Sequence, residues 1–170
     1  MTSVAICLIL PCSVLAQKDS GRITRDSKRA KAEFLKADPS MEHFFSAAYG
    51  YAILPNVGKG AMIVGGGGGN GAVYQGDKHI GTTSMVQGTV GAQIGGQAFR
   101  EVIFFENKAV FDRFRANQVE FNGQVSALAV KTGVSATAAY RDGVAIFTQG
   151  KEGFMAEVSV GGQKFTFMPL

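Results

Sequence analysis

The chain has 170 residues, with 17 Lys and Arg against 13 Asp and Glu, two cysteines and no tryptophan. This length suits one domain with a core of its own. Both cysteines, Cys7 and Cys12, lie in an apolar N-terminal segment. A mature chain without that segment would contain no disulfide, no cysteine–metal site and no cysteine nucleophile.

The apolar segment is residues 4–16, VAICLILPCSVLA, which ends in the small residue Ala16. Such a run is typical of the hydrophobic region of a secretory signal peptide, and it is too short to span a bilayer as a helix. A buried N-terminal strand is the alternative. We expect residues 1–16 to be a signal peptide cleaved after Ala16, and the protein to be periplasmic or secreted.

The net charge of +4 is concentrated in residues 17–36, which carry seven Lys and Arg against three Asp and Glu, while the rest of the chain is neutral. Basic side chains flanking apolar ones are typical of an amphipathic helix that lies on an anionic membrane. An ordinary solvated helix, packed on a sheet by Phe34 and Leu35, is the alternative. The candidate lipid-binding residues are Arg22, Arg25, Lys28, Arg29, Lys31, Phe34 and Leu35, with Lys59 in a later glycine-flanked loop.

Helical periodicity extends from Asp26 to about Tyr49, where apolar residues recur every three or four positions. Asp38 and Pro39 divide this stretch, because aspartate caps a helix N-terminus and proline suits the first helical position. We expect two short helices, or one with a bend. A further helix is predicted over residues 107–116, capped by its first residue, an asparagine.

The remainder of the chain has the pattern of strands separated by tight turns. Gly76–Asp77 predicts a two-residue turn that places Tyr74 opposite His79. Asp142–Gly143 predicts a second turn, preceded by a strand over residues 135–141. A third turn is predicted at positions 161 and 162, both of which are glycine. The order of elements predicts an α+β fold: a large curved antiparallel sheet, barrel-like, with N-terminal helices and one inserted helix.

Five consecutive glycines occupy residues 65–69, and Gly66, Gly68 and Gly71 match the pattern G-x-G-x-x-G. A dinucleotide-binding loop of this kind needs a strand before it and a helix after it, so that the phosphates meet the helix N-terminus. A predicted hairpin follows here instead. We interpret the glycines as a place where strands bend and another backbone approaches closely.

Catalytic and metal-binding motifs are missing from the sequence. His43 and His79 have no second metal ligand at a suitable spacing, and neither H-E-x-x-H nor G-x-S-x-G occurs. Aromatic residues are not interleaved with the basic ones, as stacking on nucleic acid bases would require. We therefore expect no enzymatic activity, no metal or cofactor and no nucleic acid partner.

Three stretches resemble the SYLF-domain family in their order and spacing: GYAILPNVGKGAMIVGGGGGNGAVY, TVGAQIGGQAFREVIFFENKAVFDRF and AIFTQGKEGFMAEVSVGGQKF. The first contains a Pro-x-x-x-Lys-Gly segment at Pro55–Gly60. The last is similar to the family's C-terminal element through Lys151, Gly153, Phe154, Val158, Ser159 and Gly162. The likeness runs from about Ala30 to Phe167. We therefore divide the chain into a signal peptide (1–16), a basic N-terminal segment (17–29) and a SYLF-like domain (30–170).

The resemblance implies a non-catalytic domain that binds acidic phospholipids, with actin binding in some eukaryotic members. Because it also has a predicted signal peptide, the chain resembles the exported bacterial branch of the family. Proteins of that branch would encounter the bacterial lipids phosphatidylglycerol, cardiolipin or phosphatidic acid. We expect an exported protein that is peripherally attached to an anionic phospholipid membrane. A structural or protein-interaction module of the cell envelope is the alternative.

Overall fold

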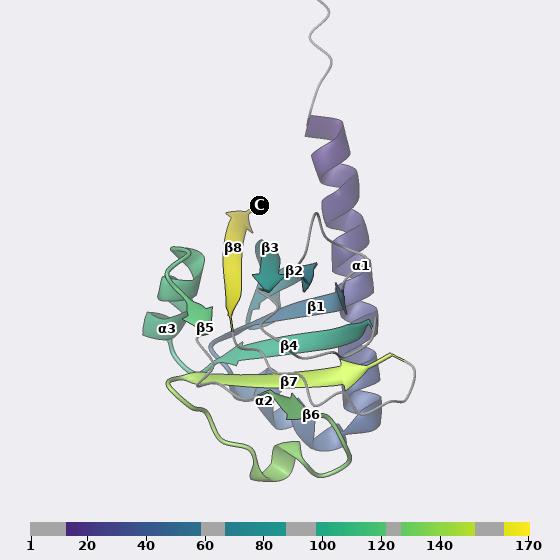
Figure 1. Ribbon diagram of the computed structural model, residues 1–170, viewed down its shortest axis with the longest axis vertical. Coiled ribbons are helices and arrows are strands. Elements are labelled where there is room, and N and C mark those ends of the chain that lie inside the picture. The colour runs from purple at the N-terminus through teal and green to yellow at the C-terminus, as the bar shows by residue number, and fades with distance from the viewer. Residues whose placement is uncertain (1–12, 59–66, 88–97, 122–126, 152–161) are drawn as a thin grey trace, which may run out of the picture.

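The computed structural model describes residues 13–58, 67–87, 98–121, 127–151 and 162–170 (Figure 1). Its helical elements are α1 (Ser13–Ala37), the 3-10 turn η1 (Pro39–Met41), α2 (Glu42–Ala47), α3 (Lys108–Arg115) and the 3-10 turn η3 (Ser135–Thr137). Its strands are β1 (Gly50–Gly58), β2 (Gly67–Gln75), β3 (Lys78–Gln87), β4 (Phe99–Phe105), β5 (Glu120–Phe121), β6 (Leu128–Ala129), β7 (Val144–Gly150) and β8 (Gln163–Pro169).

The described strands form one eight-stranded sheet in the order β5-β8-β3-β2-β1-β4-β7-β6. Every neighbouring pair is antiparallel except β6 and β7, which are parallel. The sheet is strongly twisted, so that β3 and β8 run in a different direction from β4 and β7 (Figure 1). This arrangement confirms the predicted α+β class. The sheet is open rather than closed, with the short strands β5 and β6 at its two edges.

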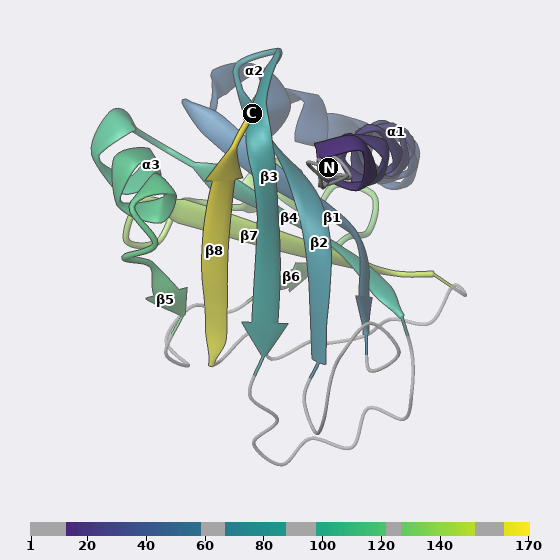
Figure 2. The ribbon, with the colours of Figure 1, turned by 90° about the horizontal axis from the view of Figure 1, so that it is seen from above.

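The two faces of the sheet carry separate hydrophobic clusters. On one face, which we call the helix face, α1 and α2 cover β1, β2, β4 and β7, as the view from above shows for α1 beside β1 and β2 (Figure 2). The buried cluster there includes Phe34, Phe44, Tyr51 and Phe104. On the other, the inner face, α3 packs with residues from strands far apart in the sheet order, such as Phe105 of β4 and Phe165 of β8. The sheet therefore curls around this second cluster.

The N-terminal helices follow the predicted division at Asp38 and Pro39. The Asp38 side chain accepts a hydrogen bond from the Ser40 backbone N–H at 3.1 Å, and Pro39 is the first residue of η1. The first helix is longer than expected, because it begins at Ser13 rather than near Asp26. The proposed boundaries after residues 16 and 29 both lie inside α1. The third helix agrees with the prediction, since the Asn107 side chain caps α3.

The predicted turns have different outcomes. Tyr74 pairs with His79 as expected across the first turn. At the second turn, Arg141 and Val144 form a backbone bridge, but the predicted strand over residues 135–141 is wrong. The reason is a tertiary contact. The Asp38 carboxylate accepts a hydrogen bond from the Ser135 backbone N–H, and the segment that begins there forms η3 instead of a strand. The third turn lies partly outside the described residues.

Candidate functional site

Helix α1 is fixed to the helix face of the sheet by a buried hydroxyl group on the side of the helix that contacts the strands. Ser27 has no exposed surface. Its Oγ donates to the Ile53 carbonyl oxygen at 3.1 Å and accepts from the Ala72 backbone N–H at 3.3 Å. Ile53 and Ala72 face each other across β1 and β2, so one side chain of the helix satisfies a backbone donor and a backbone acceptor at once.

The Ser27 contact lies where the pairing of β1 and β2 is interrupted. The register shifts between Ile53 and Asn56, and Pro55, within this interval, has no N–H to donate. Gly71 lies opposite, and a Cβ atom there would come within 2.4 Å of the Ile53 carbonyl oxygen. Gly71 therefore allows close backbone approach, as we interpreted the pattern, and so does Gly69, where a Cβ atom would come within 2.4 Å of the Asn56 carbonyl oxygen; Gly66 lies outside the described residues. Strand β3 follows β2, so the glycines that the structure describes are followed by a strand and not by a helix.

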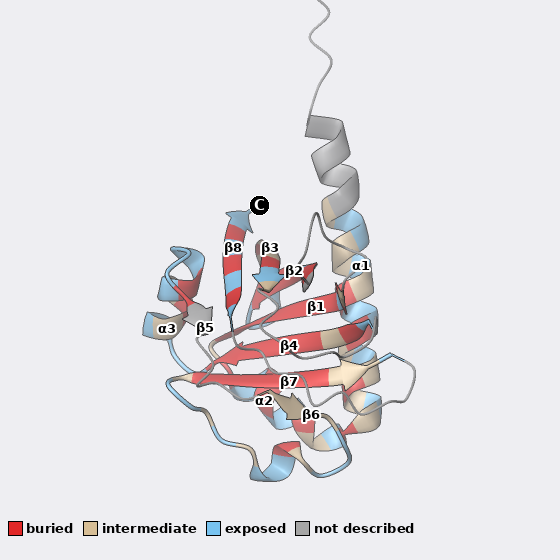
Figure 3. Cartoon of the chain, viewed as in Figure 1, coloured by how far each residue is buried: buried red, intermediate tan, exposed pale blue. Residues whose placement is uncertain are grey.

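The outer side of α1 carries four of the predicted basic residues. Arg22, Arg25, Lys28 and Arg29 are all exposed, while the opposite side of the helix is buried (Figure 3). Arg29 lies 3.9 Å from Asp26, and its side chain is 78% exposed. The other three form no ion pair within the described part of the chain. These cations are available to an external anion.

The remaining candidate residues are placed differently. Phe34 has no exposed surface and belongs to the core of the helix face, and Leu35 is partly buried against the same core. Packing on the sheet, the alternative for these two residues, is thus what the fold shows. The Lys31 Nζ lies 4.5 Å from the centroid of the Phe45 ring. Lys59 lies outside the described residues.

A carboxylate at the C-terminal end of α1 links the N-terminal helices to η3. Asp38 accepts from Ser40 N–H at 3.1 Å, from Gly133 N–H at 3.1 Å, and from both the N–H and the hydroxyl of Ser135 at 2.9 and 2.7 Å. Burial alone would raise the pKa of Asp38, but these hydrogen bonds outweigh it and lower the pKa from 3.8 to about 2. Asp38 is therefore ionised at neutral pH and rigidly held.

The inner face contains a second buried carboxylate with far fewer donors. Glu101 of β4 has no exposed surface and accepts from the Gln163 side chain of β8 at 2.9 Å. Its other oxygen, the Gln163 amide oxygen and the Thr148 hydroxyl have no hydrogen-bond partner among the described residues. Burial raises the pKa of Glu101 to about 7. The sequence signal for this group is one acidic residue inside the largely apolar run AFREVIFF, and this signal is too weak to predict a buried carboxylate.

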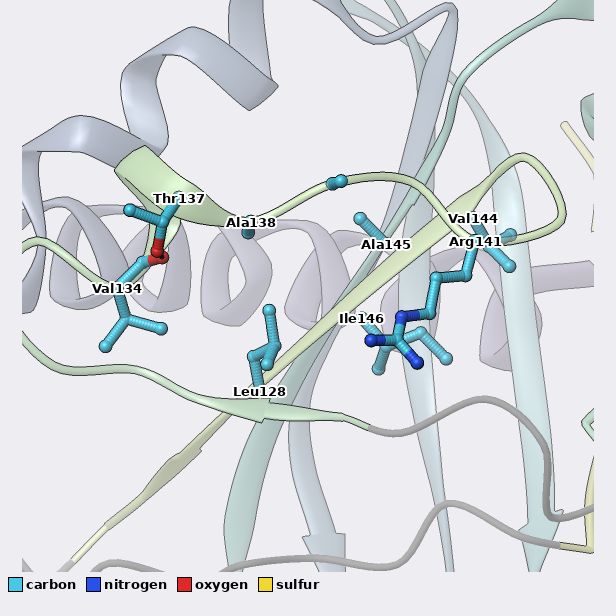
Figure 4. A pocket seen from close by; sticks show the side chains of 9 residues that line it. Leu128, Val134, Thr137, Ala138, Arg141, Val144, Ala145 and Ile146 are labelled. Atoms are coloured by element: carbon cyan, nitrogen blue, oxygen red, sulfur yellow. Dashed lines mark hydrogen bonds between the residues drawn. The ribbon is translucent and has the colours of Figure 1, made fainter.

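A pocket of about 270 Å³ lies beside the edge of the sheet, between β6, β7 and the segment that contains η3 (Figure 4). Seven of the nine described residues that line it have apolar side chains, while polar and apolar atoms are exposed in it to about the same extent. The side chains that line it are Leu128, Val134, Thr137, Ala138, Ala139, Arg141, Val144, Ala145 and Ile146. Figure 4 shows the Arg141 side chain extended along β7 beside Ile146. No sequence pattern indicates this site, because its lining comes from three separate elements.

Two further observations concern the chemistry available to the described residues. No group of three or more His, Cys, Asp or Glu side chains among them is arranged to hold a metal ion. No helix in the described part of the chain has both the length and the apolar character needed to cross a membrane.

These features define an α+β domain in which a basic helix packs on an open, curved sheet. Residues 86–168 match the model of the Ysc84 family, described as "Las17-binding protein actin regulator". The chain is 32% identical over 127 residues to "Beta cell expansion factor A" of Aeromonas veronii, an alignment that covers 75% of this chain and 49% of that protein. The chain thus spans about half the length of this curated relative. Residues 86–168 belong to the Ysc84, or SYLF-domain, family, which confirms the resemblance inferred from the motifs.

Proposed function

We propose that this chain is a non-catalytic module that binds acidic phospholipids at a membrane surface through the outer side of α1. One observation carries the proposal: Arg22, Arg25, Lys28 and Arg29 are exposed on a helix whose opposite side is fixed to the sheet. The charge is therefore presented by a rigid body. Family membership supports a lipid-binding or actin-regulatory module in general terms.

The electrostatic contribution is large enough to measure. Each Lys or Arg near an anionic membrane surface contributes about 1 kcal/mol, and this attraction is screened by salt. Because Phe34 is buried, the binding we propose is mainly electrostatic and does not depend on insertion of this aromatic side chain. Attachment should be reversible and should weaken as the ionic strength rises.

Vesicle sedimentation of the full chain tests this proposal. Changing Arg22, Arg25 and Lys28 to Gln should lower partitioning onto phosphatidylglycerol vesicles about a hundredfold, since three charges are lost. A matched control changes three exposed basic residues elsewhere to Gln: Lys78, Arg113 and Lys131. Equal binding to neutral phosphatidylcholine vesicles, or an equal effect of the two triple variants, would contradict the proposal.

Export is part of the same proposal and has its own test. Residues 4–16 have the composition of a signal peptide, which supports a periplasmic or secreted protein. N-terminal sequencing of the protein recovered from cells should give Gln17 as the first residue. A mature protein that still begins at Met1 would overturn this part.

A protein-interaction module is the second candidate, because the matching family model is described as a Las17-binding actin regulator. In that case the sheet and its helices would serve as a platform for a protein partner, and lipids would be irrelevant. Recovery of the chain in a stable complex, together with no affinity for anionic vesicles, would favour this function over lipid binding.

A further inference from the structure

We propose that the pocket between β6, β7 and η3 binds the alkyl chain of an anionic amphiphile, with Arg141 pairing with its carboxylate or phosphate group. This site is separate from the outer side of α1, and the inference does not depend on the membrane function proposed above. It rests on the character of the lining, on the size of the pocket and on how Arg141 is held.

The lining combines apolar side chains with polar atoms, as a hydrocarbon chain with a charged end requires. Apolar side chains come from all three elements that surround the pocket, among them Leu128 of β6, Ile146 of β7 and Val134 beside η3. Arg141 is the only cation among the described residues of the lining. It is exposed and forms no ion pair within the described residues. A guanidinium group in this setting complements a carboxylate or a phosphate, with which it can form two parallel hydrogen bonds.

The backbone at Arg141 is fixed by a tight turn. The Arg141 N–H donates to the Val144 carbonyl oxygen at 2.8 Å, and the Val144 N–H donates to the Arg141 carbonyl oxygen at 3.0 Å. Asp142 and Gly143 between them have φ angles of 51° and 78°, the left-handed conformation of a two-residue hairpin turn. The base of the Arg141 side chain is thereby held at the pocket before any ligand arrives.

The volume limits the length of the chain that fits. An apolar cavity of about 150 Å³ holds one benzene molecule, which has six carbons. A pocket of about 270 Å³ therefore has room for roughly ten carbons. A single alkyl chain of about eight to ten carbons matches this volume.

Calorimetric titration of the full chain with octanoate, decanoate and dodecanoate tests the size argument. Each buried methylene should raise the affinity about fourfold. The gain should continue up to about ten carbons and stop there, because longer chains extend into water. An affinity that keeps rising at the same rate from decanoate to dodecanoate would overturn the assignment to this pocket.

Titration of variants tests the residues. Arg141→Gln should lower the affinity for decanoate about tenfold and leave the affinity for uncharged decanol unchanged. Arg113→Gln, on the exposed side of α3, removes the same charge elsewhere and should have no effect. Val134→Phe should weaken both ligands by narrowing the pocket. Binding of decanoate that is equal in the native chain and in Arg141→Gln, or no binding at all, would overturn the proposal.

The source of the amphiphile can be read from the same variant. If Arg141→Gln loses affinity for decanoate but keeps its affinity for phosphatidylglycerol vesicles, the ligand is a free fatty acid or a similar single-chain anion. If it loses affinity for both, the pocket takes one chain of a membrane lipid. The triple variant of Arg22, Arg25 and Lys28 should bind decanoate normally, so a failure of this inference is distinguishable from a failure of the membrane proposal.

Discussion

Asp38, at the end of α1, and Glu101, on the inner face of the sheet, are both carboxylates without exposed surface, yet their surroundings differ. Asp38 accepts four hydrogen bonds, from three different residues, whereas Glu101 accepts one. The pKa of Asp38 is accordingly lowered to about 2, and that of Glu101 is raised to about 7. The number of donors, rather than burial, decides how fully each carboxylate is ionised at neutral pH.

The difference in hydrogen bonding gives the two carboxylates different structural roles. The Asp38 group joins η1 to the segment around Ser135, which is almost a hundred residues further along the chain, and it completes the hydrogen bonding there. The Glu101 group joins β4 to β8 across the curled sheet but leaves three polar atoms without a partner among the described residues. The hydrogen bonds of the Asp38 carboxylate are therefore satisfied, whereas the Glu101 group is held in the inner face at a cost in stability.

The largest expected effect is the response of Glu101 to pH. Its folded pKa of about 7 exceeds the ordinary value of 4.5 because burial outweighs the hydrogen bond from Gln163. Between these two values the folded chain holds one more proton than the unfolded chain, so the free energy of unfolding falls as the pH rises. The loss amounts to about 3 kcal/mol. Glu101→Gln should remove it, as measured by urea denaturation at pH 5 and pH 8.

The matched control for this experiment is Glu106→Gln, which removes the same charge from an exposed position at the end of β4. It should leave the difference between pH 5 and pH 8 as it is in the native chain. If Glu101→Gln retained that difference in full, the group responsible would lie elsewhere and the comparison with Asp38 would fail.

Asp38 should show the opposite dependence at a lower pH. Its folded pKa is about 2, below the ordinary value of 3.8, so the unfolded chain binds more protons between these values and stability falls as the solution is acidified. Asp38→Asn removes the charge that the donors face and should lower the free energy of unfolding at pH 7 by about 2 kcal/mol. The variant should also lose the acid-dependent part of the unfolding curve below pH 4.

Asp77→Asn, in the exposed turn between β2 and β3, is the control for the loss of one negative charge. It should change the stability at pH 7 by far less than Asp38→Asn. Similar unfolding curves for the two variants between pH 2 and pH 4 would show that the donors around Asp38 do not stabilise its charged form.

Ser27 provides a third polar contact, between the helix and the strands, with a smaller effect. Ser27→Ala leaves the Ile53 carbonyl oxygen and the Ala72 N–H without this partner, which should cost about 1 to 2 kcal/mol. The Ala72 amide should also exchange its hydrogen faster. Thr24→Ala is the control, because the Thr24 hydroxyl donates only within α1, to the Ser20 carbonyl oxygen. An unchanged exchange rate at Ala72 would mean that Ser27 does not hold the helix to the sheet.

Local signals in the sequence were sufficient for several elements. The caps at Asp38 and Asn107 and the register of Tyr74 opposite His79 follow from short-range rules and agree with the structure. The extent of α1 did not follow, because Ser27 joins the helix to the sheet through polar contacts that a search for recurring apolar residues does not detect. Ser27 lies ahead of the boundary placed after residue 29, yet it is fully buried.

The sites that depend on distant contacts were the ones missed. The segment before Arg141 has the turn and the small residues of a hairpin, but the contact between Ser135 and Asp38 forms it into η3. The pocket beside Arg141 and the bond between Glu101 and Gln163 each join elements that are far apart in the chain. A single sequence carries no signal for such pairings. The charge pattern of the helix is local, and four of its basic residues, Arg22, Arg25, Lys28 and Arg29, are exposed in the structure.

The smallest expected effect concerns Lys31, whose position lies between the two sides of α1. Its Nζ lies 4.5 Å from the centroid of the Phe45 ring and 5.4 Å from that of Tyr51, within the range of a cation–π interaction. Lys31→Gln should lower the free energy of unfolding by about 0.5 kcal/mol. Lys28→Gln, one helical turn earlier and exposed, should leave the stability unchanged.

In the vesicle assay the order of the two lysine variants should be reversed, with the larger effect for Lys28→Gln. Lys28 is free to approach a headgroup, so its loss should lower partitioning onto phosphatidylglycerol vesicles about fivefold. Lys31 is held by aromatic rings of the helix face, and its loss should have a smaller effect on binding than on folding. If Lys31→Gln weakened vesicle binding as much as Lys28→Gln did, the membrane-facing surface would extend around the helix to the aromatic cluster. The outer side of α1 would then be only part of the site.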